Sequence, residues 1–545
     1  MGGSMAATAD TAPVQRELII PSAIVRVAGD VENTELLTKS RAGQVGLNEM
    51  NYTLMRGKCG VILDFGRELH GGVRIVCGFG TNHARIRIRL GESVGECLSE
   101  IGERGSTNDH ALRDITVPLP MLSDTEFLSS GFRFAHIELL EEGAELRIKA
   151  INAVFIHRAR KQVGTFVCSD ELINRIFDTA AYTVQLCAQD LIWDGIKRDR
   201  LVWMGDLYPE ITALLCLCED DECIARSLDF VRSETPLPLW MNNYPMYSMW
   251  WIMNVREYCR RTGNFDYALA QRGYFYGLLE QIDGCIAEDG SFDFGGNFID
   301  WPTHGHADEE EGVRCLAKMC AQNALELEKL YGSDGTLSEG ILKKLCRRDA
   351  SVLEKKQIAA LKCLSGTPMS AVEIQLLLRG GAYGFSTFMS YFLLKAQCRL
   401  KGSEYALNSL RQYYGGMLRL GATTFWEDFD LDWEKGNVCP IDRLPRPGER
   451  DIHGDYGRFC YEGYRHSLCH GWSAGIIPFL VEEVLGVVPV EDGYRRVRIA
   501  PKLGGLRFAK GDIPTPYGVL HVECRDEGGK LDLKITAPDG VQVVS

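Results

Sequence analysis

The spacing of apolar residues changes twice along this chain of 545 residues. Between about residues 15 and 165, apolar and polar residues alternate, which is typical of strands with one buried face. Near Ser169 the spacing becomes helical, and near residue 488 the alternation returns. The chain is also too long for one hydrophobic core. The clearest alternating segments are Gly60–Phe65, Gly72–Cys77, Ala84–Leu90, Ala144–Ala150, Tyr494–Pro501 and Val519–Cys524.

We therefore expect three domains: an N-terminal antiparallel β-sandwich over 15–165, a helical domain over 168–487 and a C-terminal β-sandwich segment over 488–545. About twelve successive helices suit an (α/α)6 toroid, a ring of helical hairpins. A bundle or a solenoid also fits, although no repeat of fixed length is visible. The last segment is short and would pack on the helical domain or join the first sandwich.

The predicted helices are read from runs of apolar residues at helical spacing. Ser169 stands where a capping residue would begin the first of them, and acids follow in its first turn. The predicted helices cover residues 170–189, 207–218, 220–232, 247–261, 266–285, 308–331, 337–364, 386–400, 404–418 and 473–486.

Composition narrows the class of protein. The net charge of −14 disfavours nucleic acid as a partner. No apolar run reaches the 18 or so residues of a membrane span, and the first residues lack the pattern of a signal peptide. The 19 cysteines are scattered without a C-x-x-C pair, which indicates free thiols. We expect a cytoplasmic protein without nucleic-acid or membrane partners; a homodimer is compatible with the sequence.

The segment Asp194–Asp206 combines three acids, two arginines, a lysine and a tryptophan. A pocket that binds a polar ring and transfers protons needs this mixture. Asp194 and Asp199 would lie 140° apart on a helix, so the segment is better interpreted as a loop bent around a site. Asp206 would begin the next helix. The plainer alternative is a solvated charged loop with a helix cap.

Glu427 stands directly after Trp426 and lies more than 200 residues after the Asp194–Asp206 segment. Together with the first segment it supplies the second carboxylate that glycoside hydrolysis needs. A solvated acidic loop is the plainer interpretation. Calcium binding by the acids between 427 and 434 is disfavoured, because the run lacks the glycine and closing glutamate of an EF-hand.

A third loop, Asn297–Asp308, contains His304, His306 and Asp308. No helical H-x-x-x-H places two imidazoles on one face, so we expect no metal and assign Asp300 and Trp301 to the substrate lining. His470 is a site residue or a buried core histidine, and Ser473 would cap the last long helix.

Tryptophan is concentrated in the middle of the chain, since all nine lie between Trp193 and Trp472. Several stand in loops beside polar residues, where their rings suit stacking on the apolar faces of sugars. The alternative is that the tryptophans pack in the core of a large helical domain, as we expect for Trp250 and Trp251.

These motifs, in this order, resemble bacterial α-L-rhamnosidases of glycoside hydrolase family 78. The resemblance covers nearly the whole chain. It rests on Val61–Leu69, Asp194–Asp206, Thr423–Glu427, Ser467–Ser473, Arg498–Leu506 and Gly511–Gly518.

The resemblance implies an inverting hydrolase on an (α/α)6 barrel with flanking β-sandwiches and no cofactor. Glu427 matches the general base of the family and Asp199 falls at the general acid. The family usually has Glu at position 199, and an Asp side chain is one methylene shorter. The residues expected to bind substrate are Asp194, Arg198, Trp203, Asp206, Asp300, Trp301, Trp426 and His470.

Two alternatives stay open. One is another glycosidase or a lyase on the same toroid. The other is a sugar-binding protein that has lost catalysis, which the Asp at position 199 favours.

Overall fold

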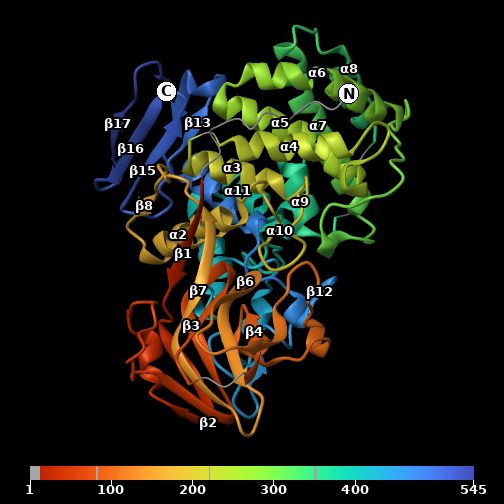
Figure 1. Cartoon of the computed structure of the whole chain (residues 1–545). Coiled ribbons are helices and arrows are strands. Elements are labelled where there is room, and N and C mark those ends of the chain that lie inside the picture. Colours follow the sequence, from red (N-terminus) through yellow and green to blue (C-terminus); the bar gives the residue numbers. More distant parts are fainter. Residues whose placement is uncertain (1–12, 81–83, 220, 349–352, 545) are drawn as a thin grey trace.

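The computed structural model describes residues 13–80, 84–219, 221–348 and 353–544. The N-terminal strands form one end of the molecule, the helices form its bulk, and a second group of strands lies beside the helices near the C-terminus (Figure 1).

The N-terminal sheet has seven strands in the order β1-β7-β3-β6-β4-β5, with β2 paired to β3. Most pairings are antiparallel, as predicted, but β3 and β7 are parallel. Gly71 allows that approach, because a Cβ there would lie 1.9 Å from the carbonyl oxygen of Val154. The strands are β1 Val14–Ile19, β2 Ala23–Glu32, β3 Thr53–Cys77, β4 Ala84–Gly91, β5 Asp114–Leu119, β6 Asp124–Leu139 and β7 Glu145–Arg158. A short helix, α1 (Val94–Leu98), follows β4.

The core of this sheet reaches beyond the sheet itself. Alternating residues such as Val61, Ile88 and Ile137 point into it and are fully buried. Ile196 and Cys469, from two loops of the helical region, belong to the same buried cluster. The sheet is therefore packed directly against the loops that carry the predicted site residues.

The helical region begins at α2. Its helices pack mainly on helices that lie next to them, or one helix further along, in the chain. Contacts join α5 to α7, α7 to α8, and α11 to α12. The helices are α2 Glu171–Cys187, α3 Leu207–Leu217, α4 Glu222–Glu234, α5 Pro245–Thr262, α6 Phe265–Gly284, α7 Glu309–Leu330, α8 Thr336–Leu345, α9 Lys356–Leu364, α10 Ala371–Leu378, α11 Ser390–Lys401, α12 Ser403–Arg419 and α13 Ile476–Phe479.

Several helix predictions need correction. The segment 337–364 holds two helices, α8 and α9, and α10 was not predicted. The last segment is a 3₁₀ turn (Gly471–Gly475), α13 and a π turn (Leu480–Val484).

Two predicted caps are also wrong. Asp170, not Ser169, caps α2, since its carboxylate accepts from the N–H groups of Leu172 and Ile173. The hydroxyl of Ser473 donates to the carbonyl of His470 at 2.7 Å and caps no helix.

The C-terminal strands form two small sheets. One contains β13 Val487–Pro489, β14 Arg496–Ile499 and β18 Gln542–Val544; the other contains β15 Phe508–Thr515, β16 Gly518–Asp526, β17 Leu531–Thr536 and β8 Val167–Cys168. Because β8 precedes α2, the C-terminal sheet is tied to the point where the helical region begins.

Four two-residue strands lie between α12 and α13. They are β9 Val438–Cys439, β10 Arg450–Asp451, β11 Gly457–Arg458 and β12 Tyr461–Glu462. β11 and β12 form a hairpin whose turn is Phe459 and Cys460.

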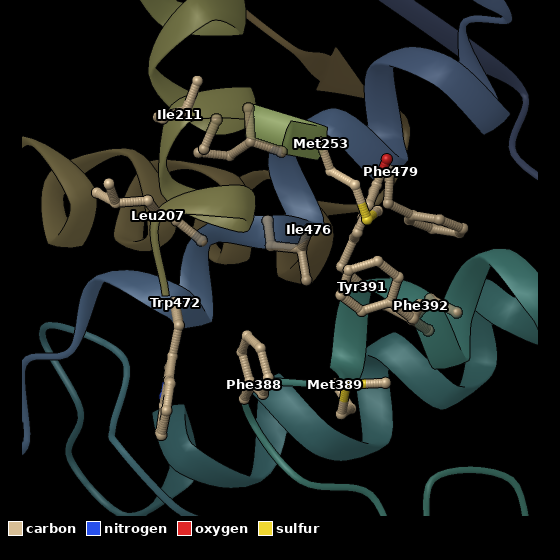
Figure 2. Close-up of a cluster of buried hydrophobic side chains, with 14 of the residues drawn as sticks. Leu207, Ile211, Met253, Phe388, Met389, Tyr391, Phe392, Trp472, Ile476 and Phe479 are labelled. Carbon is tan, nitrogen blue, oxygen red and sulfur yellow. The ribbon is translucent and has the colours of Figure 1, made fainter. Parts of the chain in front are cut away.

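A cluster of apolar side chains supports the loops around residue 472 (Figure 2). Leu207 and Ile211 of α3 and Ile476 and Phe479 of α13 belong to this cluster, and the two helices are in contact. Trp472 stands at its edge, with its ring 5.2 Å from that of Phe388.

All 19 cysteines are free in the structure, and most are buried. Across the described ranges, we find no helix with the length and apolar character needed to cross a bilayer.

Candidate active site

The Asp194–Asp206 segment is a buried loop between α2 and α3, so the solvated alternative is wrong. Asp194, Arg198 and Asp206 are all buried. The loop closes on itself, because the N–H of Leu201 donates to the Asp194 carboxylate at 2.9 Å and the N–H of Asp194 donates to the Leu201 carbonyl at 3.1 Å. Asp206 stands at the start of α3, but its side chain caps no N–H group there.

Two consecutive residues of this loop adopt the left-handed conformation. Asp199 has φ of 55° and Arg200 has φ of 54°, a region that residues other than glycine rarely occupy. Neighbouring groups hold the turn: the Arg200 Nε donates to the Ile196 carbonyl at 2.9 Å, and His110 Nδ1 lies 3.2 Å from the Asp199 carbonyl. Strain of this kind is concentrated at functional sites.

The predicted site residues line one cavity of about 210 Å³, with the exceptions of Asp300 and Trp426. They come from the loop before α3, from the loop before α7 and from the two segments around Glu427 and His470. The cavity is lined by Asp194, Arg198, Asp199, Trp203, Asp206, Tyr244, Tyr247, Phe298, Trp301, Glu427, Cys460, Arg465, His470 and Trp472.

Arg198 connects the two predicted catalytic acids. Its Nη1 donates to Asp199 at 2.9 Å, and its Nη2 donates to Glu427. Burial opposes the charge of Arg198, but the carboxylates of Glu427 and Asp199 outweigh burial and raise its pKa. One guanidinium therefore fixes the spacing of two carboxyls that lie 228 residues apart in the chain.

Glu427 is fixed by the segment around Ser467 as well. The N–H of Ser467 donates to the second carboxylate oxygen of Glu427 at 3.0 Å. The backbone N–H of Glu427 donates to the Ser467 carbonyl at 2.9 Å, and the indole N–H of Trp472 donates to the Glu427 carbonyl at 3.0 Å.

Burial also changes the protonation of the remaining polar groups. It raises the pKa of Asp194 and Asp206 well above the usual range, and neighbouring acids add to the shift. Burial and then Arg198 lower the pKa of His470, so its imidazole is neutral at pH 7. The His470 Nε2 lies 3.7 to 3.9 Å from oxygens of Asp194, Asp206 and Glu427. These groups present both donors and acceptors to a polyhydroxylated ligand.

Aromatic rings complete the wall. Trp203 lies edge-on to Tyr247 at 6.0 Å, and the Tyr247 hydroxyl donates to Asp206 at 3.4 Å. We did not predict Tyr244, Tyr247, Phe298, Cys460, Arg465 or Trp472 as site residues. The dense aromatic and asparagine run before α5 was the one signal for the two tyrosines.

Asp300 and Trp426 lie behind the cavity wall. Asp300 accepts from the Trp301 N–H at 2.9 Å and from the Ser386 hydroxyl, and so orients Trp301. Burial raises the pKa of Asp300 to about 7. Trp426 is buried beside Phe429, with ring centroids 5.7 Å apart.

Three of the acids after Glu427 have arginine partners, and Asp432 is paired with Lys435. Arg458 binds Asp428 and Asp430, and Arg419 binds Glu434 at 2.9 Å. In the third loop, Asp308 instead accepts from the N–H groups of Glu354 and Lys355.

The N-terminal sheet holds the site through Lys197. Its ammonium lies 2.8 Å from Glu92 and 3.3 Å from Glu96, and it donates to the carbonyls of Tyr464 and His466. Glu92 also accepts from the Leu468 N–H at 2.7 Å. One segment carries Arg198, and the other carries Ser467, which binds Glu427. Acids from the sheet region thus join these two segments.

Glu92, Glu96 and His453 gather ligand atoms within 4.8 Å of one another, as a metal site would. The Lys197 ammonium already contacts both carboxylates. Burial raises the pKa of Glu92 to about 7, although Lys197 opposes that shift.

Comparison with known families gives two matches. Residues 161–259 match the bacterial alpha-L-rhamnosidase 6 hairpin glycosidase domain, and residues 486–544 match the bacterial alpha-L-rhamnosidase C-terminal domain. Two separate parts of the chain are therefore similar to domains of bacterial alpha-L-rhamnosidases. The predicted resemblance is confirmed, and the enzymes of this family are glycoside hydrolases.

A curated alpha-L-rhamnosidase from Alteromonas sp. (strain LOR) is 35% identical over 74 residues, which cover 13% of this chain and 8% of that protein.

Solved rhamnosidases share the fold. The GH78 rhamnosidase of Bacillus sp. GL1 superposes with a TM-score of 0.73 at 23% identity, over 91% of this chain and 54% of that one. The Streptomyces avermitilis alpha-L-rhamnosidase complexed with L-rhamnose gives 0.72 at 14% identity, over 98% and 50%. The Klebsiella oxytoca rhamnosidase with rhamnose bound gives a TM-score of 0.66 at 16% identity, over 86% of this chain and 96% of that one. The chain spans about half the length of the first two.

Proposed function

We propose that this chain is a glycoside hydrolase that releases terminal α-L-rhamnose from rhamnosides. The observation that carries the proposal is the pair Asp199 and Glu427, held by one buried guanidinium inside a small cavity of acids and aromatic rings. The two matches to rhamnosidase domains support rhamnose as the sugar that is released.

We infer that the helical region, 168–487, is an (α/α)6 toroid that carries the site. The flanking domains would be β-sandwiches over 15–165 and 488–545. The rhamnosidase folds that superpose on the chain support this architecture.

In the proposed mechanism, Asp199 protonates the glycosidic oxygen as the bond to the sugar breaks. Glu427 takes a proton from a water molecule, whose oxygen attacks the anomeric carbon from the opposite face. Inversion needs carboxyls about 6.5–9.5 Å apart, which leaves room for this water. The side chain of Asp199 is 20% exposed and that of Glu427 is 5% exposed, so Asp199 is the acid nearer the outside, where the leaving group departs.

The remaining cavity residues would bind the sugar ring. Asp194 and Asp206, whose pKa values burial raises, and neutral His470 offer donors and acceptors to hydroxyl groups. Trp203 would stack on an apolar face of the ring. Asp300 and Trp426 would act from behind the wall.

The test is a panel of aryl glycosides followed by proton NMR of the first-formed sugar. We expect release of rhamnose alone among common sugars, with the β anomer appearing first. If the α anomer appears first, the enzyme retains the anomeric configuration instead of inverting it. If a different glycoside is hydrolysed, the substrate carries another sugar.

Two alternative functions can be tested separately. A lyase on the same fold would give an unsaturated product, which ultraviolet absorbance detects. A non-catalytic sugar-binding protein is favoured by the Asp at position 199, whose carboxylate is paired with Arg198. A single-turnover assay with an aryl rhamnoside decides, because a binding protein would release no phenol.

We further propose a cytoplasmic location. The 19 free cysteines support it, since thiols persist in a reducing compartment.

A further inference from the structure

The sugar cavity adjoins a second, wider cavity of about 590 Å³. The two share Cys460 and Arg465 in their linings. The second cavity is lined from one side by Arg104 and Gly105 of the N-terminal region and from the other by residues 454–463. A glycoside whose sugar fills the smaller cavity can therefore extend its leaving group into the wider one.

Phe459 occupies an unfavourable position on this second cavity. It stands in the two-residue turn between β11 and β12, with φ of 63°. Such turns favour glycine or asparagine, because a side chain at positive φ is strained. The Phe459 side chain is also 41% exposed. A large apolar residue that is both strained and exposed serves neither the turn nor the core, which indicates a role in binding.

The ring of Phe459 is nonetheless held in place. It lies nearly parallel to the ring of Trp301, with centroids 6.1 Å apart and planes 23° apart. Tyr461 lies edge-on to it at 6.1 Å, and the Arg458 guanidinium lies 5.6 Å from its centroid. Because Trp301 lines the sugar cavity, the two rings form a continuous aromatic surface from one cavity to the other.

The two arginines that line the wider cavity are each paired with an acid, and the further acid in its lining, Glu462, is exposed to solvent. Arg104 lies 3.0 Å from Asp455, and Arg465 lies 3.0 Å from Asp109. These pairs give a leaving group of either charge little net attraction.

We propose that Phe459 is the surface on which the leaving group stacks, and that the preferred leaving group is an uncharged ring. The inference rests on the proposed rhamnosidase function and makes Phe459 a specificity-determining residue. A sugar ring and an aromatic ring both present a face suited to this contact.

The experiment compares methyl, cyclohexyl and benzyl α-L-rhamnosides, all of which release an alcohol rather than a phenol. For Phe459→Ala we expect kcat/KM to fall about three- to tenfold on the two ring-bearing substrates and to change less than twofold on the methyl glycoside. Phe459→Tyr keeps the ring and should keep the rates. A loss on benzyl alone assigns an aromatic leaving group, and a loss on both assigns any ring, including a second sugar.

A second variant separates binding from folding. Phe459→Asn suits the left-handed turn, so it should unfold at the same or a higher temperature than the wild type while losing rate on the ring-bearing substrates. Phe230→Ala is the matched control, since Phe230 is 44% exposed on α4 and lines neither cavity. It should behave as the wild type does on all three substrates.

Three results would overturn the inference. Equal losses on methyl and ring-bearing substrates would show a general role in the site. Unchanged rates in Phe459→Ala, with an active wild type, would remove the stacking role and leave the proposed function intact. A wild type inactive on all three glycosides, and on an aryl rhamnoside, would remove the proposed function and the inference with it.

Discussion

At the scale of single residues, the site places its carboxyls in two kinds of surroundings. Asp194 and Asp206 are buried with few counter-charges, and burial raises their pKa. Asp199 and Glu427 share the one guanidinium of Arg198. We expect this difference in surroundings to separate the groups proposed to bind hydroxyls from the groups proposed to transfer protons.

Glu427→Gln should lower kcat by about 10²–10⁴, because the amide keeps the shape but cannot take a proton from water. Binding of free rhamnose, measured by calorimetry, should persist. Glu434→Gln is the control on the same segment, since Glu434 binds Arg419 outside the cavity. A Glu427→Gln variant with more than about a tenth of the wild-type rate would exclude the base assignment.

Asp199→Ala should respond to the acidity of the leaving group. An alkyl rhamnoside needs its oxygen protonated as the bond breaks, whereas a nitrophenyl rhamnoside hardly does, so the loss should be far larger on the alkyl substrate. The basic limb of the pH–rate profile should flatten. Asp199→Glu restores the usual family residue and tests whether the cavity is built for the shorter side chain. Equal losses on both substrates would move the acid role to a neighbour such as Asp194.

At the scale of elements, short turns and loops carry the site, and side chains behind them fix their shape. Asp300 orients the 3₁₀ turn that begins at Trp301. Lys197 joins the loop before α3 to the segment around His466.

Asp300→Asn should change the pH dependence of stability. Burial raises the pKa of the folded Asp300 carboxyl to about 7 from an ordinary value near 3.8. Below both pKa values the carboxyl is protonated in the folded and the unfolded state, so it does not change the free energy of unfolding. Between about pH 4 and pH 7 the unfolded state ionises first, so the wild type loses stability as the pH rises.

The asparagine variant cannot ionise and escapes this loss. Its free energy of unfolding, relative to the wild type, should therefore rise between about pH 4 and pH 7 and then level off. Urea unfolding across this range measures the difference. A difference independent of pH would show that Asp300 keeps an ordinary pKa in the folded protein.

Lys197→Met should destabilise the protein by about 3–5 kcal/mol, because it removes the ammonium that contacts both buried acids, Glu92 and Glu96, and leaves Arg113 beside Glu96 alone. Activity should fall too, since the segment that positions Arg198 loosens. Arg419→Met breaks a largely exposed ion pair and should cost no more than about 1 kcal/mol. If both variants unfold at the same denaturant concentration, the buried pair has no special role.

At the scale of the whole molecule, the N-terminal sheet is part of the site. Arg133 donates to the Gly421 carbonyl at 3.1 Å, and the N–H of Glu68 donates to the Thr423 hydroxyl at 3.0 Å. Both contacts lie just before Glu427, so the sheet supports the proposed base as well as Lys197.

A chain that begins at residue 160 should therefore be inactive even where it is soluble, because it lacks Glu92, Glu96 and Arg133. It should also expose Ile196 and Cys469, which the sheet now covers, and so aggregate. Activity assays and size-exclusion chromatography measure both effects. An active, monomeric fragment would show that the sheet is a separable accessory domain.

The sequence by itself determined the order of strands, helices and strands, the relationship to the rhamnosidases, and the gathering of acids and aromatic residues around Asp194–Asp206. These features are local: periodicity, turn residues and short motifs can each be seen within a few neighbours. The cap at Asp170 rather than Ser169 and the irregular segment after His470 were missed, because caps and turns depend on backbone geometry as much as on residue type.

Only the tertiary structure decided which distant groups meet. It alone placed one guanidinium between Asp199 and Glu427, brought Glu92 of the sheet region to Lys197, and put Asp300 and Trp426 behind the cavity rather than on it. It also added Tyr247 and Phe459 to the two cavities. Contacts between residues hundreds of positions apart are set by the packing of whole elements, and a single sequence carries no local signal for them.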